Sequence, residues 1–251
     1  MAKLVGRSGE QRILEEAATS ADAELVAVYG RRRIGKTFLI RETYGDSICF
    51  ELVGIHGVDL PTQLRAFADA LGRVTRSPAV LAPPADWYAA FEQLRTFLSG
   101  RLARRTARKQ VVFLDEVPWL TTRRSGFLGA LEHFWNGWAS RESRLVVVIC
   151  GSSASWMLRE IVRQRGGLHN RVTRRIRLEP FTLGEAEELL HTREVRLGRY
   201  QTIELYMALG GVPHYLAQVR GGESAAQNID RLCFARDGLL RTEFAEHERA
   251  C

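Results

Sequence analysis

Short runs of apolar and β-branched residues recur along the chain and predict the strands of a buried sheet. Runs that are apolar on both faces are typical of parallel strands covered by helices on either side. The runs are Leu25–Tyr29, Ile48–Val53, Val111–Leu114, Leu145–Cys150 and Arg175–Leu178. The segments between them are long enough for crossover helices, so the pattern indicates an α/β fold with a parallel sheet.

Amphipathic helices are predicted between these runs, where apolar residues repeat at steps of three and four. The longest patterns are Trp87–Leu102 and Phe127–Trp138, and shorter ones cover Phe38–Tyr44 and Leu60–Leu71. Gly72–Asp86 is rich in proline and is predicted to be a loop. We expect the aromatic residues of the two long helices to pack in the core rather than to line a ligand site.

The pattern changes after Pro180, where helical periodicity replaces the strand runs. Thr182 and Glu185 have the spacing of a capping box at the start of a helix. The helical patterns are Glu185–His191, Tyr200–Leu209 and Tyr215–Val219, with Gly210 to Pro213 between the last two. We therefore expect an αβ domain over residues 1–181 and a small helical lid over residues 182–251.

Composition narrows the class of protein. The chain has 251 residues, of which 45% are hydrophobic, so a sizeable core is expected. No apolar run approaches the ~20 residues that span a bilayer, and the first residues lack the apolar stretch of a signal peptide. These features predict a soluble, cytoplasmic protein. The net charge of +7 suits an acidic partner such as a nucleic acid, a nucleotide or an anionic membrane.

The strongest candidate site follows the first predicted strand. The segment Gly30-Arg31-Arg32-Arg33-Ile34-Gly35-Lys36-Thr37 matches the phosphate-binding pattern G-x-x-x-x-G-K-[ST], and it opens a predicted helix. Its glycines allow backbone N–H groups to surround phosphate oxygens, and the helix start adds unpaired N–H groups. Lys36 is expected to reach the β- and γ-phosphates, and the Thr37 hydroxyl is expected to bind Mg²⁺.

Acidic residues end the third predicted strand. Asp115 is the candidate second protein ligand of Mg²⁺, and Glu116 is the candidate general base that polarises the attacking water. Neighbouring residues of a regular strand point to opposite faces, so both can serve one site only if the strand ends here. Pro118 is consistent with such an end.

Two further candidates complete the site. Ser152, with Ser153 in reserve, follows the fourth strand and could sense the γ-phosphate; the alternative is that a serine caps the next helix. Arg171, which precedes Arg174 and Arg175, is a candidate arginine finger for a neighbouring subunit. The alternative for this arginine is a salt bridge or a basic face.

Six segments resemble, in the family's order, the motifs of archaeal-type ATPases of the STAND class, a branch of the P-loop NTPases close to AAA+ proteins. They are Leu4–Glu10, Gly30–Thr37, Phe113–Leu120, Gly151–Ser153, Asn170–Arg171 with Leu178–Phe181, and Gly211–Pro213. The resemblance implies a three-layer αβα fold with sheet order 5-1-4-3-2 and a helical lid. It also implies that Gly6 and Arg7 lie near the nucleotide and that Pro213 leans on the base.

The expected function is therefore ATP binding and hydrolysis with Mg²⁺ in a molecular switch. Catalytic roles fall to Lys36, Glu116, Ser152 and Arg171, and the nucleotide contacts extend from Gly30 through Phe38. The alternatives are a nucleotide-gated DNA-binding module with little turnover and a small-molecule kinase. Expected partners are ATP and ADP, a second copy of the chain, and DNA or an effector protein, with no membrane. Family members usually continue into a winged-helix domain, and this chain ends where that domain would begin.

Overall fold

The computed structural model describes residues 4–76, 80–103, 108–122, 125–163, 168, 170–241 and 243. Internal contacts divide the chain into two compact units. The sheet unit comprises residues 8–32 and 36–178, and the helical unit comprises the described parts of 1–7, 33–35 and 179–251. Each unit is described by itself.

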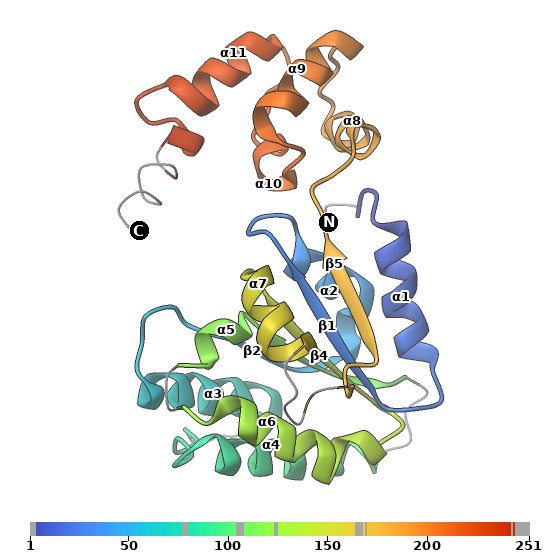
Figure 1. Ribbon diagram of the computed structural model, residues 1–251, viewed down its shortest axis with the longest axis vertical. Coiled ribbons are helices and arrows are strands. Elements are labelled where there is room, and N and C mark those ends of the chain that lie inside the picture. Colours follow the sequence, from blue (N-terminus) through green and yellow to red (C-terminus); the bar gives the residue numbers. More distant parts are fainter. Residues whose placement is uncertain are drawn as a thin grey trace. The chain divides into compact units, whose positions relative to one another are not determined.

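The sheet unit is built on five parallel strands in the order β2-β3-β4-β1-β5 (Figure 1). The strands are β1 (Glu24–Gly30), β2 (Ile48–Val53), β3 (Gln110–Asp115), β4 (Leu145–Gly151) and β5 (Arg174–Leu178). Every residue of β1, β3 and β4 is buried, because helices cover both faces of the sheet. The strand order confirms the expected 5-1-4-3-2 arrangement and its P-loop NTPase fold.

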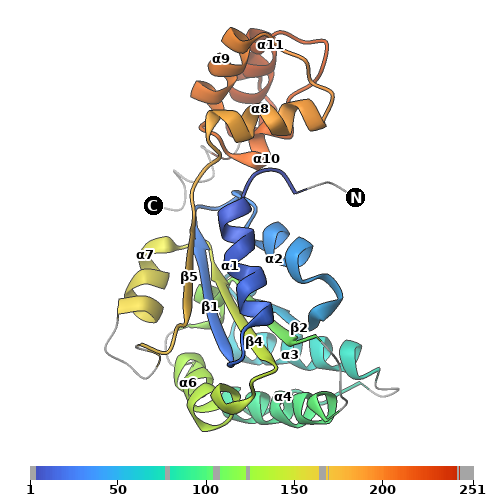
Figure 2. The same ribbon diagram turned by 90° about the vertical axis from the view of Figure 1, so that its right-hand side faces the viewer.

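Helices form the outer two of three layers in this unit (Figures 1 and 2). On one face lie α1 (Ser8–Thr19) and α2 (Lys36–Tyr44), and on the other lie α3 (Leu60–Thr75), α4 (Trp87–Leu102) and α6 (Phe127–Gly137). Shorter turns are η1 (Gly45–Ser47), α5 (Val117–Leu120), η2 (Ala139–Arg141), α7 (Ala154–Trp156) and η3 (Met157–Arg163). The three layers are the predicted αβα class.

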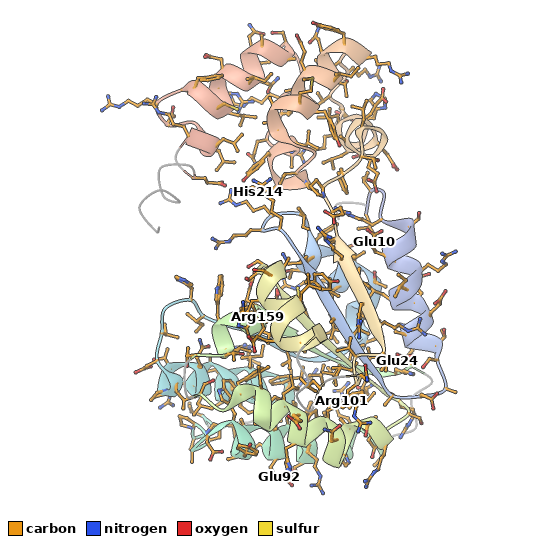
Figure 3. All side chains as sticks on the ribbon, viewed as in Figure 1. Glu10, Glu24, Glu92, Arg101, Arg159 and His214 are labelled. Atoms are coloured by element: carbon orange, nitrogen blue, oxygen red, sulfur yellow. The ribbon has the colours of Figure 1, made fainter. Side chains whose placement is uncertain are left out.

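Aromatic residues of α3, α4 and α6 form the centre of the larger core. The Trp87 ring lies 4.9 Å from that of Phe127, 6.2 Å from Phe67 and 6.4 Å from Phe91. Trp87 and Phe127 are each 1% exposed, whereas Glu92 on α4 points outward (Figure 3). Phe91, Phe134 and Trp135 are buried as well, so the prediction of core packing is confirmed for these aromatics, whereas Tyr88 of α4 is 51% exposed.

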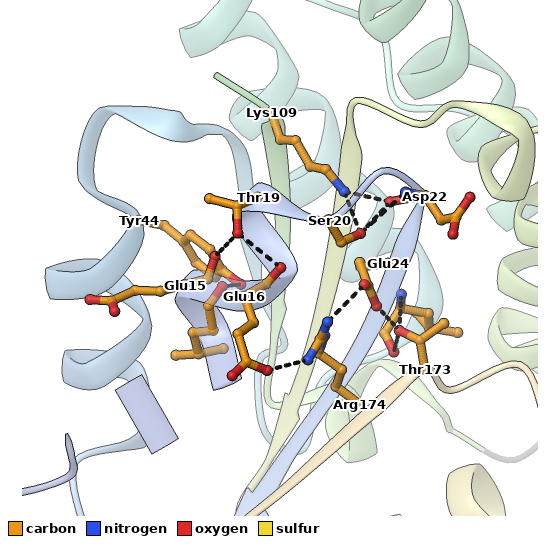
Figure 4. A network of polar contacts seen from close by, with 12 residues as sticks. Glu15, Glu16, Thr19, Ser20, Asp22, Glu24, Tyr44, Lys109, Thr173 and Arg174 are labelled. Carbon is orange, nitrogen blue, oxygen red and sulfur yellow. Dashed lines mark hydrogen bonds and ion pairs between the residues drawn. The ribbon is translucent and has the colours of Figure 1, made fainter. Parts of the chain in front are cut away.

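Polar side chains are paired at the sheet edge where β1 and β5 begin (Figure 4). The carboxylate of Glu24 accepts a hydrogen bond from the Thr173 hydroxyl and pairs with Arg174 at 3.3 Å. Arg174 also bonds Glu16 of α1 at 2.9 Å. For Arg174, therefore, the salt-bridge alternative is the observed one.

The helical unit contains α8 (Leu183–Thr192), α9 (Arg199–Leu209), α10 (Pro213–Leu216), α11 (Ala225–Ile229) and η4 (Asp230–Phe234). Its own core joins Phe181, Leu190, Leu205 and Leu216, among others. The predicted capping box is present, with Thr182 and Glu185 each accepting from the other's backbone N–H. Among the described residues of both units, no helix is long and apolar enough to cross a membrane.

Several predicted boundaries were wrong. Helix α3 runs on to Thr75, past Gly72, so the predicted Gly72–Asp86 loop starts too early; residues 77–79 of that loop lie outside the described residues. The helix predicted over Tyr215–Val219 begins at Pro213 instead, because proline suits the first turn, and it ends at Leu216. Helices α1 and α11 were not predicted, although Ser224 and Gln227 have the capping-box spacing that marks the start of α11.

Candidate functional site

The carboxyl ends of β1, β3 and β4 bring the main candidate residues to one edge of the sheet. Strand β1 ends at Gly30, β3 ends at Asp115 and β4 ends at Gly151. Because the strands are parallel and in register, the segments that follow them leave from the same edge. Open α/β sheets bind their ligands at this edge.

The loop after β1 has the conformation that a phosphate cradle needs. Gly35 has a φ of +88°, and a Cβ placed there would meet no atom within 4 Å, so the backbone is open to a ligand. Lys36 is only 6% exposed, and its Nζ donates to the carbonyl oxygens of Gly30 at 3.1 Å and Arg31 at 2.9 Å. An ammonium group has three donors, so one remains for a phosphate oxygen.

Thr37 and Asp115 meet as expected for a shared ion site. The Thr37 hydroxyl donates to Asp115 Oδ2 at 2.7 Å, and Asp115 is 4% exposed. Asp115 Oδ1 accepts the backbone N–H of Glu116 at 2.9 Å. Within the described residues, no group of three His, Cys, Asp or Glu side chains is placed to hold a metal. The pair fits Mg²⁺, which takes few protein ligands and fills its shell with water and phosphate oxygens.

Glu116 leaves the strand geometry and turns toward the end of β4. Its φ is +48°, in the left-handed region, directly after the last residue of β3. Its Oε2 accepts from the backbone N–H of Ser152 at 3.1 Å and from the Ser152 hydroxyl at 2.8 Å. Because the strand ends at Asp115, the two acidic residues no longer alternate between faces, and both reach this edge.

Backbone packing holds Glu116 in that conformation. Gly54 donates its N–H to the carbonyl oxygen of Asp115 at 2.9 Å. A Cβ at Gly54 would lie 2.5 Å from the carbonyl oxygen of Glu116, so only glycine permits this approach.

The serine cap alternative is not what the structure shows, because Ser153 precedes α7 and makes no side-chain capping bond.

The arginines inside the loop differ in their surroundings. Arg31 and Arg32 are exposed, and the Arg32 guanidinium lies 5.7 Å from the centre of the Trp119 ring. The carbonyl oxygen of Trp119 accepts from the buried amide of Gln63 at 3.1 Å. The sequence interpretation gave Trp119 and Gln63 no part in the site, since neither belongs to the phosphate-binding pattern.

The remaining loop residues divide between the units. Ile34 is 1% exposed, whereas Phe38 in α2 is 39% exposed. Arg33, within the helical unit, has a φ of +69°, forms an ion pair with Glu243 and lies 5.9 Å from the Tyr215 ring.

Burial raises the pKa of the Cys150 thiol, with Asp115 adding to the effect, so this cysteine stays a neutral core residue.

Gly6, Arg7 and Pro213 all belong to the helical unit. Gly6 and Arg7 both have a φ of +60°, and Arg7 is 6% exposed, with its guanidinium 4.8 Å from the Phe181 ring. Pro213 is the half-buried first residue of α10. Their proposed contacts with a nucleotide stay a prediction.

Arg171 does not join the other candidates. It is exposed and lies just before β5, whose first residue pairs with Val26 in β1. This is the edge of the sheet opposite the phosphate-binding loop. Its role as an arginine finger for a neighbouring subunit stays a prediction, and its exposure fits the alternative of a basic face as well.

An uncharacterized protein of Methanocaldococcus jannaschii is 23% identical over 248 residues, which cover 96% of this chain and 51% of that protein. The chain thus spans about half the length of this curated relative.

Two solved structures share the fold at low identity. A Walker-type ATPase of Pyrococcus abyssi has a TM-score of 0.66 at 18% identity, with 98% of this chain and 76% of that one covered. A STAND protein with a tetratricopeptide repeat sensor from Pyrococcus horikoshii has a TM-score of 0.56 at 16% identity, with 100% and 33% covered. Likeness at this identity supports the fold alone.

The family comparison covers most of the chain. Residues 4–219 match the model of an ATPase domain predominantly from Archaea. The matched region begins before the Gly6-Arg7 pair, contains the phosphate-binding loop and the Asp115-Glu116 pair, and ends after Pro213. The chain belongs to this family of archaeal-type P-loop ATPase domains.

Proposed function

We propose that this chain binds ATP with Mg²⁺, hydrolyses its terminal phosphoanhydride bond and acts as a nucleotide-dependent switch. The observation that carries the proposal is the 2.7 Å hydrogen bond between Thr37 and Asp115, with Glu116 held beside it by Ser152. A phosphate-binding loop alone supports phosphate binding. The neighbouring acidic pair supports an ion and a water-activating base in addition.

Binding would begin at the loop between β1 and α2. Backbone N–H groups from Gly30 to Thr37 and the start of α2 would surround the phosphate oxygens. Lys36 would add its third N–H donor to a phosphate, and Thr37 with Asp115 would hold Mg²⁺. When bound, Mg²⁺ neutralises part of the charge that develops on the phosphate oxygens.

Hydrolysis would depend on the carboxylate of Glu116. Both hydrogen bonds from Ser152 reach Oε2 of this carboxylate, so Oε1 would be left for the attacking water. A carboxylate placed in this way can accept a proton from water as it attacks the γ-phosphate. Ser152 would fix the direction of the Glu116 carboxylate. Its hydrogen bonds to this carboxylate would lengthen or shorten as the γ-phosphate is lost. Such a contact could signal the state of the nucleotide.

The proposal extends to Gly6, Arg7 and Pro213, which the resemblance places near the nucleoside. The preference for adenine rests on the family membership and the resemblance of these residues to its motifs.

The test is ATP turnover by the purified chain and by two variants. We expect Lys36→Ala to lose ATP affinity and turnover together, because the cation that reaches the phosphates is gone. A matched control is Lys109→Ala, which removes a lysine at the other edge of the sheet, where its Nζ bonds Ser20 at 3.1 Å. Wild-type turnover in Lys36→Ala would exclude this site as the ATPase centre.

A second candidate function is DNA binding gated by nucleotide, with little turnover. The net charge of +7 favours it. Contacts with DNA phosphates release counterions, so the affinity should fall steeply as salt rises. Duplex DNA affinity measured at several salt concentrations, with ATP and with ADP, tests this candidate; a flat salt dependence contradicts it.

Association with a second copy belongs to the same proposal, through Arg171. If this arginine completes the site of a neighbour, turnover per chain should rise with protein concentration, and Arg171→Ala should remove the rise. The change from Arg175→Ala serves as the control, since this residue is also an exposed arginine near the same strand end.

A further inference from the structure

A buried amide outside the candidate site connects two segments of the sheet unit. Gln63 lies in the first turn of α3 and is 1% exposed. Its Nε2 donates to the carbonyl oxygens of Ile55 at 2.7 Å and Trp119 at 3.1 Å, and its Oε1 accepts the backbone N–H of Ile55 at 3.2 Å. Both N–H groups and the oxygen of the amide are therefore bound to backbone. A side chain bonded in this way fixes the two segments relative to each other.

The first of these segments, which follows β2, lies against the backbone of Glu116. Gly54 donates its N–H to the carbonyl oxygen of Asp115 at 2.9 Å. A Cβ at Gly54 would lie 2.5 Å from the carbonyl oxygen of Glu116, so the two backbones are in close contact. The N–H of Ile55 belongs to the peptide group that joins it to Gly54. Its hydrogen bond to Gln63 therefore fixes the position of Gly54 as well.

The second segment is α5, which holds the carbonyl group of Glu116. Trp119 donates its backbone N–H to the carbonyl oxygen of Glu116 at 2.8 Å, while its own carbonyl oxygen accepts from Gln63. The ring of Trp119 also lies 5.3 Å from that of His56, the residue after Ile55. The two segments that Gln63 connects are thus the two that contact the backbone of Glu116.

Glu116 depends on such contacts because its backbone conformation is unfavourable for a residue with a Cβ. Its φ of +48° lies in the left-handed region, where a residue other than glycine stays only when its surroundings fix it. This backbone conformation decides where the carboxylate starts, and Ser152 then binds its Oε2. A shift of the backbone at Glu116 would therefore move the carboxylate relative to Ser152 and to a water beside it.

We propose that Gln63 is a positioning residue for Glu116. The inference rests on the proposed function, in which Glu116 is the general base. As a buried side chain, Gln63 would touch neither the nucleotide nor the attacking water, and it acts through Ile55 and Trp119. Every residue in this chain of contacts belongs to the sheet unit. Loss of the amide should therefore slow hydrolysis and spare ATP binding, which depends on Lys36 and the backbone of its loop.

The test measures turnover and nucleotide affinity of the full chain with Gln63→Met. Methionine has a similar length and no amide, so it fills the space and removes all three hydrogen bonds. We expect kcat to fall about ten- to a hundredfold, since a small displacement of a reacting group has an effect of this size. The Kd of a non-hydrolysable ATP analogue, measured by calorimetry with Mg²⁺, should change less than about twofold. Gln63→Ala removes the same bonds and guards against a folding failure of the methionine variant.

The double variant with Glu116→Gln separates positioning from a general loss of packing. If Gln63 acts only through Glu116, adding Gln63→Met should lower the residual kcat by less than about twofold once the base is gone. A loss by the same factor in both backgrounds would mean that the amide affects turnover by another route, and it would contradict the inference.

Another buried amide supplies the matched control. Asn228 is 0% exposed and, like Gln63, binds both backbone groups of one residue: its Oδ1 accepts the N–H of Arg220 at 2.9 Å, and its Nδ2 donates to the Arg220 carbonyl oxygen at 3.2 Å. It belongs to the helical unit. Asn228→Ala should lower the free energy of unfolding and leave kcat per folded chain at the wild-type value.

Two further results would overturn the inference. One is a kcat within about twofold of wild type in a folded Gln63→Met or Gln63→Ala chain. The other is an equal loss of kcat in Asn228→Ala, which would show that any buried amide has this effect. Wild-type turnover in Glu116→Gln alone would instead remove the base from the proposed function itself.

Discussion

The two edges of the central sheet carry similar residues and use them differently. At the edge where β1 and β5 begin, Glu24 is bonded by Thr173 and Arg174, and Arg174 is bonded by Glu16. At the edge where β1 and β3 end, Asp115 and Glu116 accept from hydroxyl and backbone groups. In the first network an acid faces a cation, which neutralises it. In the second the acids face neutral donors, and their charge remains available for an ion or a water.

We propose that this difference separates stability from function within one unit. Charges that are paired and buried are structural, because removing one partner leaves the other without compensation. Lys36 at the other edge donates to the carbonyl oxygens of Gly30 and Arg31, and carboxylates gathered at the carboxyl ends of parallel strands are suited to bind a cation. The same substitution, glutamate to glutamine, can therefore be made at each edge, at Glu24 and at Glu116.

The largest effect is expected for Glu116→Gln. An amide keeps the shape and can still bond Ser152, but it cannot accept a proton from water, so kcat should fall by a factor of about 10² to 10⁴. ATP affinity should stay near the wild-type value, because Lys36 and the backbone of its loop are unchanged. Single-turnover rates and nucleotide titrations separate the two quantities. Loss of binding with intact chemistry would remove Glu116 as the base.

Glu24→Gln is the same substitution at the opposite edge, and here stability should fall while turnover is kept. The free energy of unfolding should fall by about 2 kcal/mol, the range for a hydrogen bond to a charged group, because Arg174 loses its buried partner. Turnover per folded chain should stay at the wild-type level. Urea unfolding and an ATPase assay at the same temperature measure both. Impaired turnover with unchanged stability would mean that the two edges are not distinct.

Ser152→Ala should have a smaller effect on turnover. The hydroxyl bond to Glu116 is lost, but the backbone N–H of residue 152 still reaches the same carboxylate oxygen at 3.1 Å. We expect kcat to fall about five- to tenfold, the size of one hydrogen bond of about 1 kcal/mol. The control is Ser153→Ala, since Ser153 makes no capping bond. Equal losses in the two variants would argue against a specific contact between Ser152 and Glu116.

The candidate site residues at the edge where β1 and β3 end were predictable because their sequence signal is local. The eight residues from Gly30 to Thr37 carry a complete pattern, and an apolar run ending in two acids marks the second strand end. The sheet order came from the resemblance, which the family match then supported. These features need only neighbours in sequence to be recognised.

The opposite edge and the N-terminal turn were not predictable in the same way. Glu24 and Thr173 are 149 positions apart, and Arg7 and Glu185 are 178 apart. No spacing rule connects residues so distant, because their meeting depends on which strands pair and on how the helices pack. Trp119 was missed as a partner of Arg32 for the same reason: a single aromatic in a short helix has no periodicity to reveal its contact.

The smallest expected effect is the pH dependence of the Glu24 contribution. Burial by itself would raise the pKa of the Glu24 carboxyl, but hydrogen bonds from Thr173, Ser20 and Arg174 more than offset it, so the pKa lies below its ordinary value of 4.5. A lowered folded-state pKa stabilises the protein above the unfolded-state pKa, and the contribution is lost as the pH falls through the folded-state value.

The difference in unfolding free energy between wild type and Glu24→Gln should therefore be constant near neutral pH and should shrink as the pH falls below about 4.5. Urea unfolding of both proteins between about pH 7 and pH 3 measures it. Glu116→Gln, at the edge where β1 and β3 end, serves as the reference, since its expected effect is on turnover and not on stability. If the wild type were more stable than Glu24→Gln by the same amount at pH 3 and at pH 7, the charge of Glu24 beside Arg174 would not be what stabilises the β1–β5 edge.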